Sequence, residues 1–180
     1  MILRKLFHFS GMVIPVVYLL GGKAFAVIVT ASLLLVSGLI EFLRLRGLLR
    51  IDFIEKHTKD QESKRPTGSF FYMLASLATI LLYRKDIAVA SIFILAISDP
   101  LSSLIGFRWG RRPLLGKTLE GTLVFFASAA AILLLSGFSV PVTLAGSAVA
   151  ALTELLSSRA VDDNLSIPLV TGLCLTILTL

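Results

Sequence analysis

The stretch IAVASIFILAISDPLSSLIGF, residues 87–107, carries a single charged side chain, Asp99. A helix needs about 20 mostly apolar residues to cross the hydrocarbon core of a bilayer. This stretch therefore predicts a membrane-spanning helix. A carboxylate near the bilayer centre costs on the order of 2.5–3.5 kcal/mol, so acidic residues in such segments tend to be functional. Asp99 is for this reason the first candidate for a functional residue.

Similar apolar blocks recur along the whole chain. Of the 180 residues, 56% are hydrophobic and 16% are charged, whereas ordinary soluble domains are about 25% charged. A soluble domain of this length could not bury so much apolar surface. We therefore predict an all-α fold, a polytopic transmembrane helical bundle that forms one integral membrane domain over residues 1–180. About seven spans are expected, at residues 6–20, 24–43, 68–83, 87–107, 119–138, 140–156 and 165–180.

Lysine and arginine predict the orientation of these spans. Cytoplasmic loops of membrane proteins carry an excess of basic residues. With seven spans, the side that holds the N-terminus has Arg4, Lys5, Arg44, Arg46, Arg50, Lys56, Lys59, Lys64, Arg65, Arg108, Arg111, Arg112, Lys117 and Arg159. The other side has only Lys23, Arg84 and Lys85. The N-terminus is therefore expected in the cytoplasm, with Arg44, Arg46 and Arg50 near anionic lipid headgroups.

Acidic and other polar residues are expected to converge on the same membrane face. In this orientation they lie toward the cytoplasmic ends of their spans or directly beside them: His8, Glu41, Asp99, Glu120, Glu154, Asp162, Asp163 and Asn164. This convergence predicts a site at the cytoplasmic surface. For Glu41 and Glu154, pairing between helices is an equal alternative, and His8 is equally well explained as a polar residue at the interface.

The segment that follows Asp99 combines small residues with a proline. Ser102, Ser103, Gly106 and Gly110 share one helical face with Asp99. A small-residue face often packs helices together, and Gly106 and Gly110 form a GxxxG pattern. Proline disfavours helix in the residue before it. Asp99 is accordingly predicted to cap a half-helix at a break, a common way to build an intramembrane site.

Next comes a basic loop, RWGRR at residues 108–112, and then GKTLEG at residues 116–121. Arginine and lysine neutralise phosphate charge, and glycines let backbone N–H groups approach phosphate oxygens. A helix beginning near Leu119, with Thr118 as its cap, would direct its positive end to the same place. A Walker loop is excluded, because position 111 is arginine and no strand precedes it.

Carboxylates beside such a loop suit Mg²⁺, which prefers oxygen ligands and bridges phosphates. Phosphoryl transfer depends mainly on positioning and charge neutralisation, so these are the groups it needs. The candidate ligands are Asp99, Glu120 and Asp163. A site at the membrane face indicates a lipid acceptor and a soluble nucleotide donor.

The motifs resemble those of the CTP-dependent lipid kinases, a family that includes dolichol kinase, phytol kinase and yeast-type diacylglycerol kinase. The matching segments span most of the chain: Arg4-Lys5-x-x-His8; Lys64-Arg65-Pro66-Thr67-Gly68; Asp99-Pro100-x-Ser102-x-x-x-Gly106-x-x-x-Gly110; Gly116-Lys117-Thr118-x-Glu120-Gly121-Thr122; and Glu154 followed by Asp162-Asp163-Asn164-Leu165-Ser166-Ile167-Pro168. Ser102 stands where the family often has alanine, and Thr118 where serine is common. The large extra membrane region of eukaryotic dolichol kinase is missing, which favours the shorter phytol-kinase or diacylglycerol-kinase branch.

The resemblance implies CTP as phosphoryl donor, a divalent metal and a long-chain lipid alcohol as acceptor. By the same resemblance, Asp99, Asp163 and Glu120 would hold Mg²⁺, while Lys117, Arg111 and Arg65 would bind phosphates. His8 or a carboxylate would take or orient the hydroxyl proton. The implied CTP-binding set is Arg65, Ser102, Gly106, Gly110, Arg111, Gly116, Lys117, Thr118, Gly121 and Asn164. The expected partners are CTP, the lipid alcohol and membrane lipids, with no nucleic acid; the short spans and small residues are compatible with a homodimer.

Two other functions fit parts of the pattern. A CTP:lipid-phosphate cytidylyltransferase shares the membrane setting, CTP, Mg²⁺ and a comparable GK-x-x-EG element, although its carboxyl-terminal signature is absent. A small ion-coupled transporter would use Asp99 and Glu154 as ion or proton sites. Transporter halves usually show an internal repeat, and this sequence has no convincing one.

Overall fold

The computed structural model describes residues 10–48, 65–157 and 162–180, which fold as a bundle of helices with one short β-hairpin. This confirms the all-α prediction. In chain order the elements are α2 (Val13–Leu45), α4 (Gly68–Leu82), α5 (Lys85–Phe93), the π-helical turn η2 (Ile94–Ser98), α6 (Asp99–Trp109), β1 (Pro113–Leu114), β2 (Lys117–Thr118), α7 (Leu119–Leu135), α8 (Val140–Leu156) and α9 (Asp163–Leu178).

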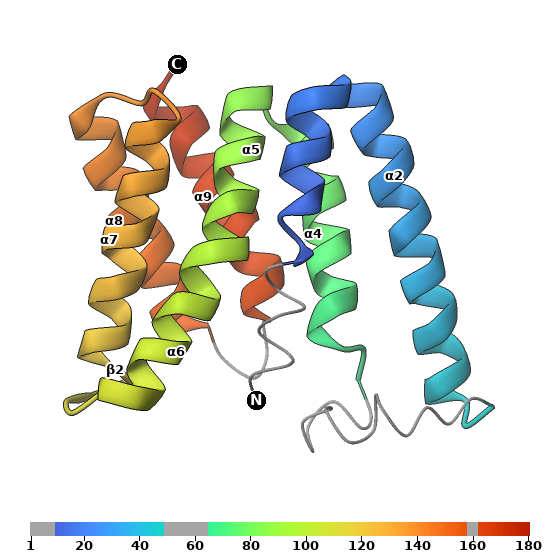
Figure 1. The fold of residues 1–180 in the computed structure, drawn as a ribbon, viewed down its shortest axis with the longest axis horizontal. Helices are drawn as coiled ribbons and strands as arrows, with labels where there is room; N and C mark the ends of the chain where they lie inside the picture. The colour runs from blue at the N-terminus through green and yellow to red at the C-terminus, as the bar shows by residue number, and fades with distance from the viewer. Residues whose placement is uncertain (1–9, 49–64, 158–161) are drawn as a thin grey trace.

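Helix α2 is interrupted at Gly22. The backbone there has φ 77° and ψ 179°, a conformation outside the helical region that glycine adopts without a Cβ clash. Figure 1 shows that the chain reverses at this point, so that two helical segments of α2 lie side by side. The break falls between the expected segments 6–20 and 24–43, in the Gly-Gly-Lys sequence at residues 21–23.

Successive helices run in alternating directions, with α5, η2 and α6 counted as one continuous helix (Figure 1). The C-terminal ends of α2, α6 and α8 and the N-terminal ends of α4, α7 and α9 therefore lie at the lower end of the bundle in this view. Helix α8 has the same bounds as its expected segment, and α4, α7 and α9 lie within a few residues of theirs. Long apolar blocks thus located the helices well.

The helix through Asp99 is continuous, which corrects the predicted half-helix. Asp99 has helical dihedrals (φ −63°, ψ −52°), and the path from Lys85 to Trp109 runs without a break. Proline removes one N–H donor and crowds the carbonyl four residues earlier. The π-helical turn η2 directly before Asp99 widens the helix and changes its hydrogen-bond register there. The chain therefore accommodates Pro100 by a local π turn, without a cap.

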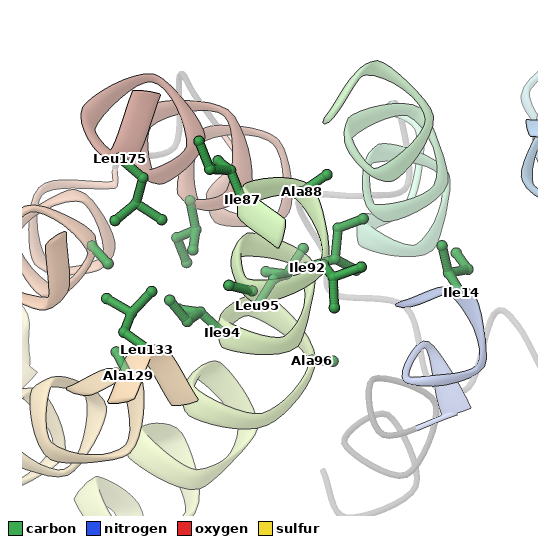
Figure 2. Packing of buried hydrophobic residues seen from close by; sticks show 14 of the residues in the cluster. Ile14, Ile87, Ala88, Ile92, Ile94, Leu95, Ala96, Ala129, Leu133 and Leu175 are labelled. Atoms are coloured by element: carbon green, nitrogen blue, oxygen red, sulfur yellow. The ribbon is translucent and has the colours of Figure 1, made fainter. Parts of the chain in front are cut away.

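The core of the bundle surrounds α5 and η2. Figure 2 shows Ile87, Ile92 and Leu95 packed between side chains of neighbouring helices, including Leu133 of α7 and Leu175 of α9. All six side chains from Ile87 to Ile92 are buried. The central position of this helix agrees with its almost uncharged sequence.

The outer surface is also strongly apolar. Large hydrophobic side chains are exposed along the helices, among them Leu20, Leu35, Phe107, Leu135 and Leu156. Several hydroxyl side chains are instead fully buried, at Thr30, Ser76, Thr79, Ser91, Ser98, Ser147 and Thr171. Within the described ranges, the α2 segment and the helix from Lys85 to Trp109 are long and apolar enough to cross a membrane, whereas α4, α7, α8 and α9 are shorter apolar helices.

Candidate functional site

The helix ends and the hairpin at the lower end of the bundle in Figure 1 belong to segments that carry most of the charged residues among those described. We call this end, with its helix termini and hairpin, the polar end; its charged residues are Glu41, Arg44, Arg46, Arg65, Arg108, Arg111, Arg112, Lys117, Glu120, Glu154, Asp162 and Asp163, and Asp99 lies deeper in the bundle on the helix that ends at Trp109. The opposite end has Lys23, Arg84, Lys85 and Asp86. The polar residues thus converge as the sequence predicted, and a series of contacts joins the helices that carry them.

The first contact joins α2 to the start of α4. Arg44 donates from Nε (3.0 Å) and Nη2 (2.6 Å) to Oε2 of Glu41, and Nη2 also donates to the backbone carbonyl of Arg65 at 2.6 Å. The side chains of Arg44 and Glu41 are only 10% and 8% exposed. Arg44 is therefore a buried structural residue, which corrects its expected place among lipid headgroups. Arg46 is exposed and lies over the ring of Phe42.

The second contact joins α4 to the start of α9. A Cβ on Gly68 would lie 2.8 Å from Nδ2 of Asn164, so the two motif segments touch. Asp162 caps α9 by accepting from the backbone N–H of Asn164 at 2.9 Å, and the Asn164 amide donates to Asp162 (2.7 Å) and Asp163 (3.3 Å). Burial, and then the nearby Asp163 carboxylate, raise the pKa of Asp162 above its usual value. Asn164 is itself buried.

The third contact joins the β-hairpin to the end of α8. The ammonium of Lys117 lies 2.7 Å from Oε1 of Glu154 and also donates to the Glu154 backbone carbonyl. The Glu154 side chain is 5% exposed and that of Lys117 is 29% exposed. Among the described residues, Oε2 of Glu154 has no hydrogen-bond partner. The hydroxyls of Ser157 and Ser166, 3.1 Å apart, continue this contact from α8 to α9.

Glu120 shapes the basic loop. Its Oε2 accepts from the backbone N–H groups of Arg111 (3.1 Å) and Arg112 (3.3 Å). The hairpin turns through Leu115 and Gly116, both with positive φ, as a tight two-residue turn requires. These backbone donors therefore already bind a carboxylate, whereas the guanidinium groups of the loop remain exposed.

Thr118 is the N-cap of α7, as predicted, and accepts from the N–H of Gly121 at 3.2 Å. Two glycines around it allow α6 and α7 to approach closely. A Cβ on Gly121 would lie 2.9 Å from the carbonyl oxygen of Ser102, and one on Gly106 would lie 2.7 Å from Oγ1 of Thr118. These small residues pack helices together, the alternative that the GxxxG pattern offered.

Gly110 belongs to the same contact, because a Cβ there would clash with Thr118 and with the carbonyl of Gly106. Gly116 instead lies at the exposed turn of the hairpin. Ser102 is buried and donates to the backbone carbonyl of Asp99 at 2.9 Å. Since Ser102 faces Gly121, Asp99 lies about one helical turn deeper in the bundle than the start of α7.

Asp99, Glu120 and Asp163 do not meet as a ready-made metal site. Within residues 10–48, 65–157 and 162–180, no group of three or more His, Cys, Asp or Glu residues is arranged to hold a metal ion. Mg²⁺ usually combines one or two carboxylates with water and substrate phosphates, so a complete set of protein ligands is not required of a magnesium site. His8 lies outside the described residues.

Sequence reasoning left the partners of two charged residues undetermined. Arg44 is three residues after Glu41, and this spacing on a helix was a usable signal for their ion pair. The pairing of Lys117 with Glu154 has no such local signal, because it depends on how α7 and α8 pack.

Comparisons with known proteins identify one relative without an assigned activity. The chain is 29% identical over 180 residues to a Rickettsia prowazekii (strain Madrid E) protein described as "Uncharacterized protein RP860"; the alignment covers 92% of this chain and 88% of that protein. No protein-family model matches the chain. No solved structure matches it.

Proposed function

We propose that this protein is an integral membrane enzyme that transfers the γ-phosphoryl group of CTP to a lipid alcohol at the polar end. The observation that carries the proposal is the contact of three separate motif segments there: Gly68 and Lys117, from two of them, contact Asn164 and Glu154 of the third. Segments far apart in sequence thus form one charged surface. The choice of CTP and of an alcohol acceptor rests on the resemblance to CTP-dependent lipid kinases.

The membrane assignment is supported by the outer surface of the bundle. Exposed Leu, Phe, Val and Ile side chains cover the helices, whereas buried positions include many hydroxyls. In water such a surface would promote aggregation, but in lipid it costs nothing. We propose seven spans, with the two segments of α2 counted separately, and a cytoplasmic polar end because that end is the more basic.

The residues of the polar end divide into two groups in this proposal. Lys117, Arg65 and Arg111 would neutralise the phosphates, and Asp99 and Asp163 would hold Mg²⁺ together with phosphate oxygens. Glu120 and Glu154 would hold the loop and Lys117 in place. In the reaction, the acceptor hydroxyl oxygen forms a bond to the γ-phosphorus as the bond to the leaving CDP oxygen breaks. The hydroxyl proton passes to His8, to a carboxylate or to water.

The test uses purified protein in lipid vesicles with Mg²⁺ and CTP labelled at either the γ or the α phosphate. A panel of long-chain alcohols, diacylglycerol and lipid phosphates serves as acceptors. Label transferred to an alcohol from γ-CTP alone supports the kinase and identifies the acceptor class. Label from α-CTP on a lipid phosphate would instead indicate a cytidylyltransferase. No transfer by a folded protein would reject both enzymes and favour a transporter.

A further inference from the structure

The end of α6 and the β-hairpin present an exposed surface that is both apolar and basic. Phe107, Trp109 and Leu115 are 74%, 55% and 70% exposed, and Arg108, Arg111 and Arg112 are exposed beside them. We call these six residues the hairpin surface. Its charge is of one sign, because residues 107–118 contain no Asp or Glu. The carboxylate of Glu120 beside it accepts hydrogen bonds from the backbone N–H groups of Arg111 and Arg112.

The hairpin holds this surface in a fixed shape. Besides the two hydrogen bonds to Glu120, the N–H of Leu119 donates to the carbonyl of Arg112 at 2.9 Å. Arg108 lies over the ring of Trp109, 5.1 Å from its centroid. Among the described residues, none of the three arginines forms an ion pair within contact distance, and Arg112 attracts the Glu120 carboxylate from farther away. The guanidinium groups are therefore available to an external anion.

Leu115 places a large apolar side chain at the exposed tip of the hairpin. Its φ of 48° lies in the left-handed region, which costs about 1–2 kcal/mol for a residue other than glycine, asparagine or aspartate. Tight hairpin turns normally place polar residues or glycine there. The exposure of this apolar side chain, and not the backbone conformation, is what favours contact of the tip with lipid.

We propose that the hairpin surface lies in the headgroup layer of the membrane and binds anionic phospholipid. Arginine forks match phosphate oxygens, and tryptophan is enriched where apolar and wet environments meet. Phe107, Trp109 and Leu115 insert among the upper acyl chains, while Arg108, Arg111 and Arg112 contact headgroup phosphates. Charge complementarity selects an anionic lipid as the occupant. Arg111 is the one residue that this surface shares with the proposed nucleotide site; lipid binding by the other five residues goes beyond phosphoryl transfer.

Trp109 is the only tryptophan of the chain, so its fluorescence reports on the hairpin without a label. The full chain is reconstituted in phosphatidylcholine vesicles with or without phosphatidylglycerol, using lipids brominated at shallow or deep acyl positions. We expect quenching mainly by shallow bromines and protection from aqueous acrylamide, both increasing with phosphatidylglycerol. Because a basic residue near such a surface contributes about fivefold in binding, R108Q/R111Q/R112Q should remove the dependence on phosphatidylglycerol.

The matched control is R84Q/K85Q at the opposite end of the bundle, which should retain that dependence. Water-like emission of wild-type Trp109 with full access to acrylamide in both vesicle types would overturn the proposal. So would a Trp109 response to Mg²⁺-CTP with no response to phosphatidylglycerol, because that result assigns the arginines to the nucleotide. The two measurements on wild-type Trp109 test the proposal even if the triple variant misfolds. Neither measurement depends on kinase activity.

Discussion

The ammonium of Lys117 lies 2.7 Å from a carboxylate oxygen of Glu154, and the two side chains join the β-hairpin to the end of α8. Glu154 is buried, so its charge depends on this single cation among the described residues. Lys117 is partly exposed and can reach outward to a phosphate from this position. The pair therefore connects the stability of the fold with the proposed binding of nucleotide.

Removing the cation of this pair should destabilise the protein. K117M leaves the Glu154 carboxylate buried and unpaired, which costs roughly 3–5 kcal/mol for fully buried pairs and less here because Lys117 is partly exposed. We expect about 2 kcal/mol. The double variant K117M/E154Q should recover part of this loss, because no buried charge remains. Thermal unfolding in detergent measures both, and R84M at an exposed pair is the control with little expected change.

The packing of α6 on α7 gives a second prediction. G121A places a methyl group 2.9 Å from the Ser102 carbonyl, so the helices must separate, at a cost of about 1–3 kcal/mol. G38A is the matched control, because its nearest new contact, with Phe70, is an ordinary 3.5 Å. G38A should be neutral or slightly stabilising, since alanine favours helix over glycine. Equal melting temperatures for the two variants would contradict the close α6–α7 contact.

Glu120 allows a loop role to be separated from a metal role. E120A removes the acceptor for the N–H groups of Arg111 and Arg112, so these amides should exchange with deuterium faster, by about tenfold if roughly 1.4 kcal/mol of local stability is lost. E120Q keeps an acceptor oxygen and should restore slow exchange. If E120Q has slow exchange but no Mg²⁺-dependent activity, Glu120 also binds the metal. Fast deuterium exchange of the Arg111 and Arg112 amides in the wild-type protein would contradict the role of Glu120 in holding the loop.

Asp162 predicts a pH dependence of stability. Its pKa is raised by burial and by Asp163, so the folded state binds the proton more tightly than the unfolded chain. Protonated Asp162 therefore stabilises the folded state. This contribution is fully present below the pKa of Asp162 in the unfolded chain and is lost as the pH rises through its higher pKa in the folded state. D162N keeps an N-cap side chain and should flatten this part of the profile. The measurement is the difference in melting temperature between wild type and D162N across the acidic range.

Sequence predicted the positions of the helices because each is a long apolar block bounded by glycine, proline or charged residues. The prediction of a helix break at Asp99 was wrong. The preference of residues before proline for extended backbone does not take into account the π turn, which accommodates Pro100 within a continuous helix. The sequence predicted that the polar residues lie at one end of the bundle. It did not predict the ion pair between Lys117 and Glu154 or the low exposure of the Arg44 side chain. Those contacts depend on which helices become neighbours, and single-sequence periodicity does not contain that information.

The central claim is that the polar end transfers the γ-phosphoryl group with Asp99 as an essential carboxylate. Its most direct test is transfer from γ-labelled CTP to lipid alcohol by wild type, D99N and the control D86N, an exposed carboxylate at the opposite end. D99N keeps the shape of the side chain but removes its charge. We expect transfer by wild type and D86N, and none by a folded D99N. Retained transfer by D99N, or its loss in D86N alone, would contradict the account.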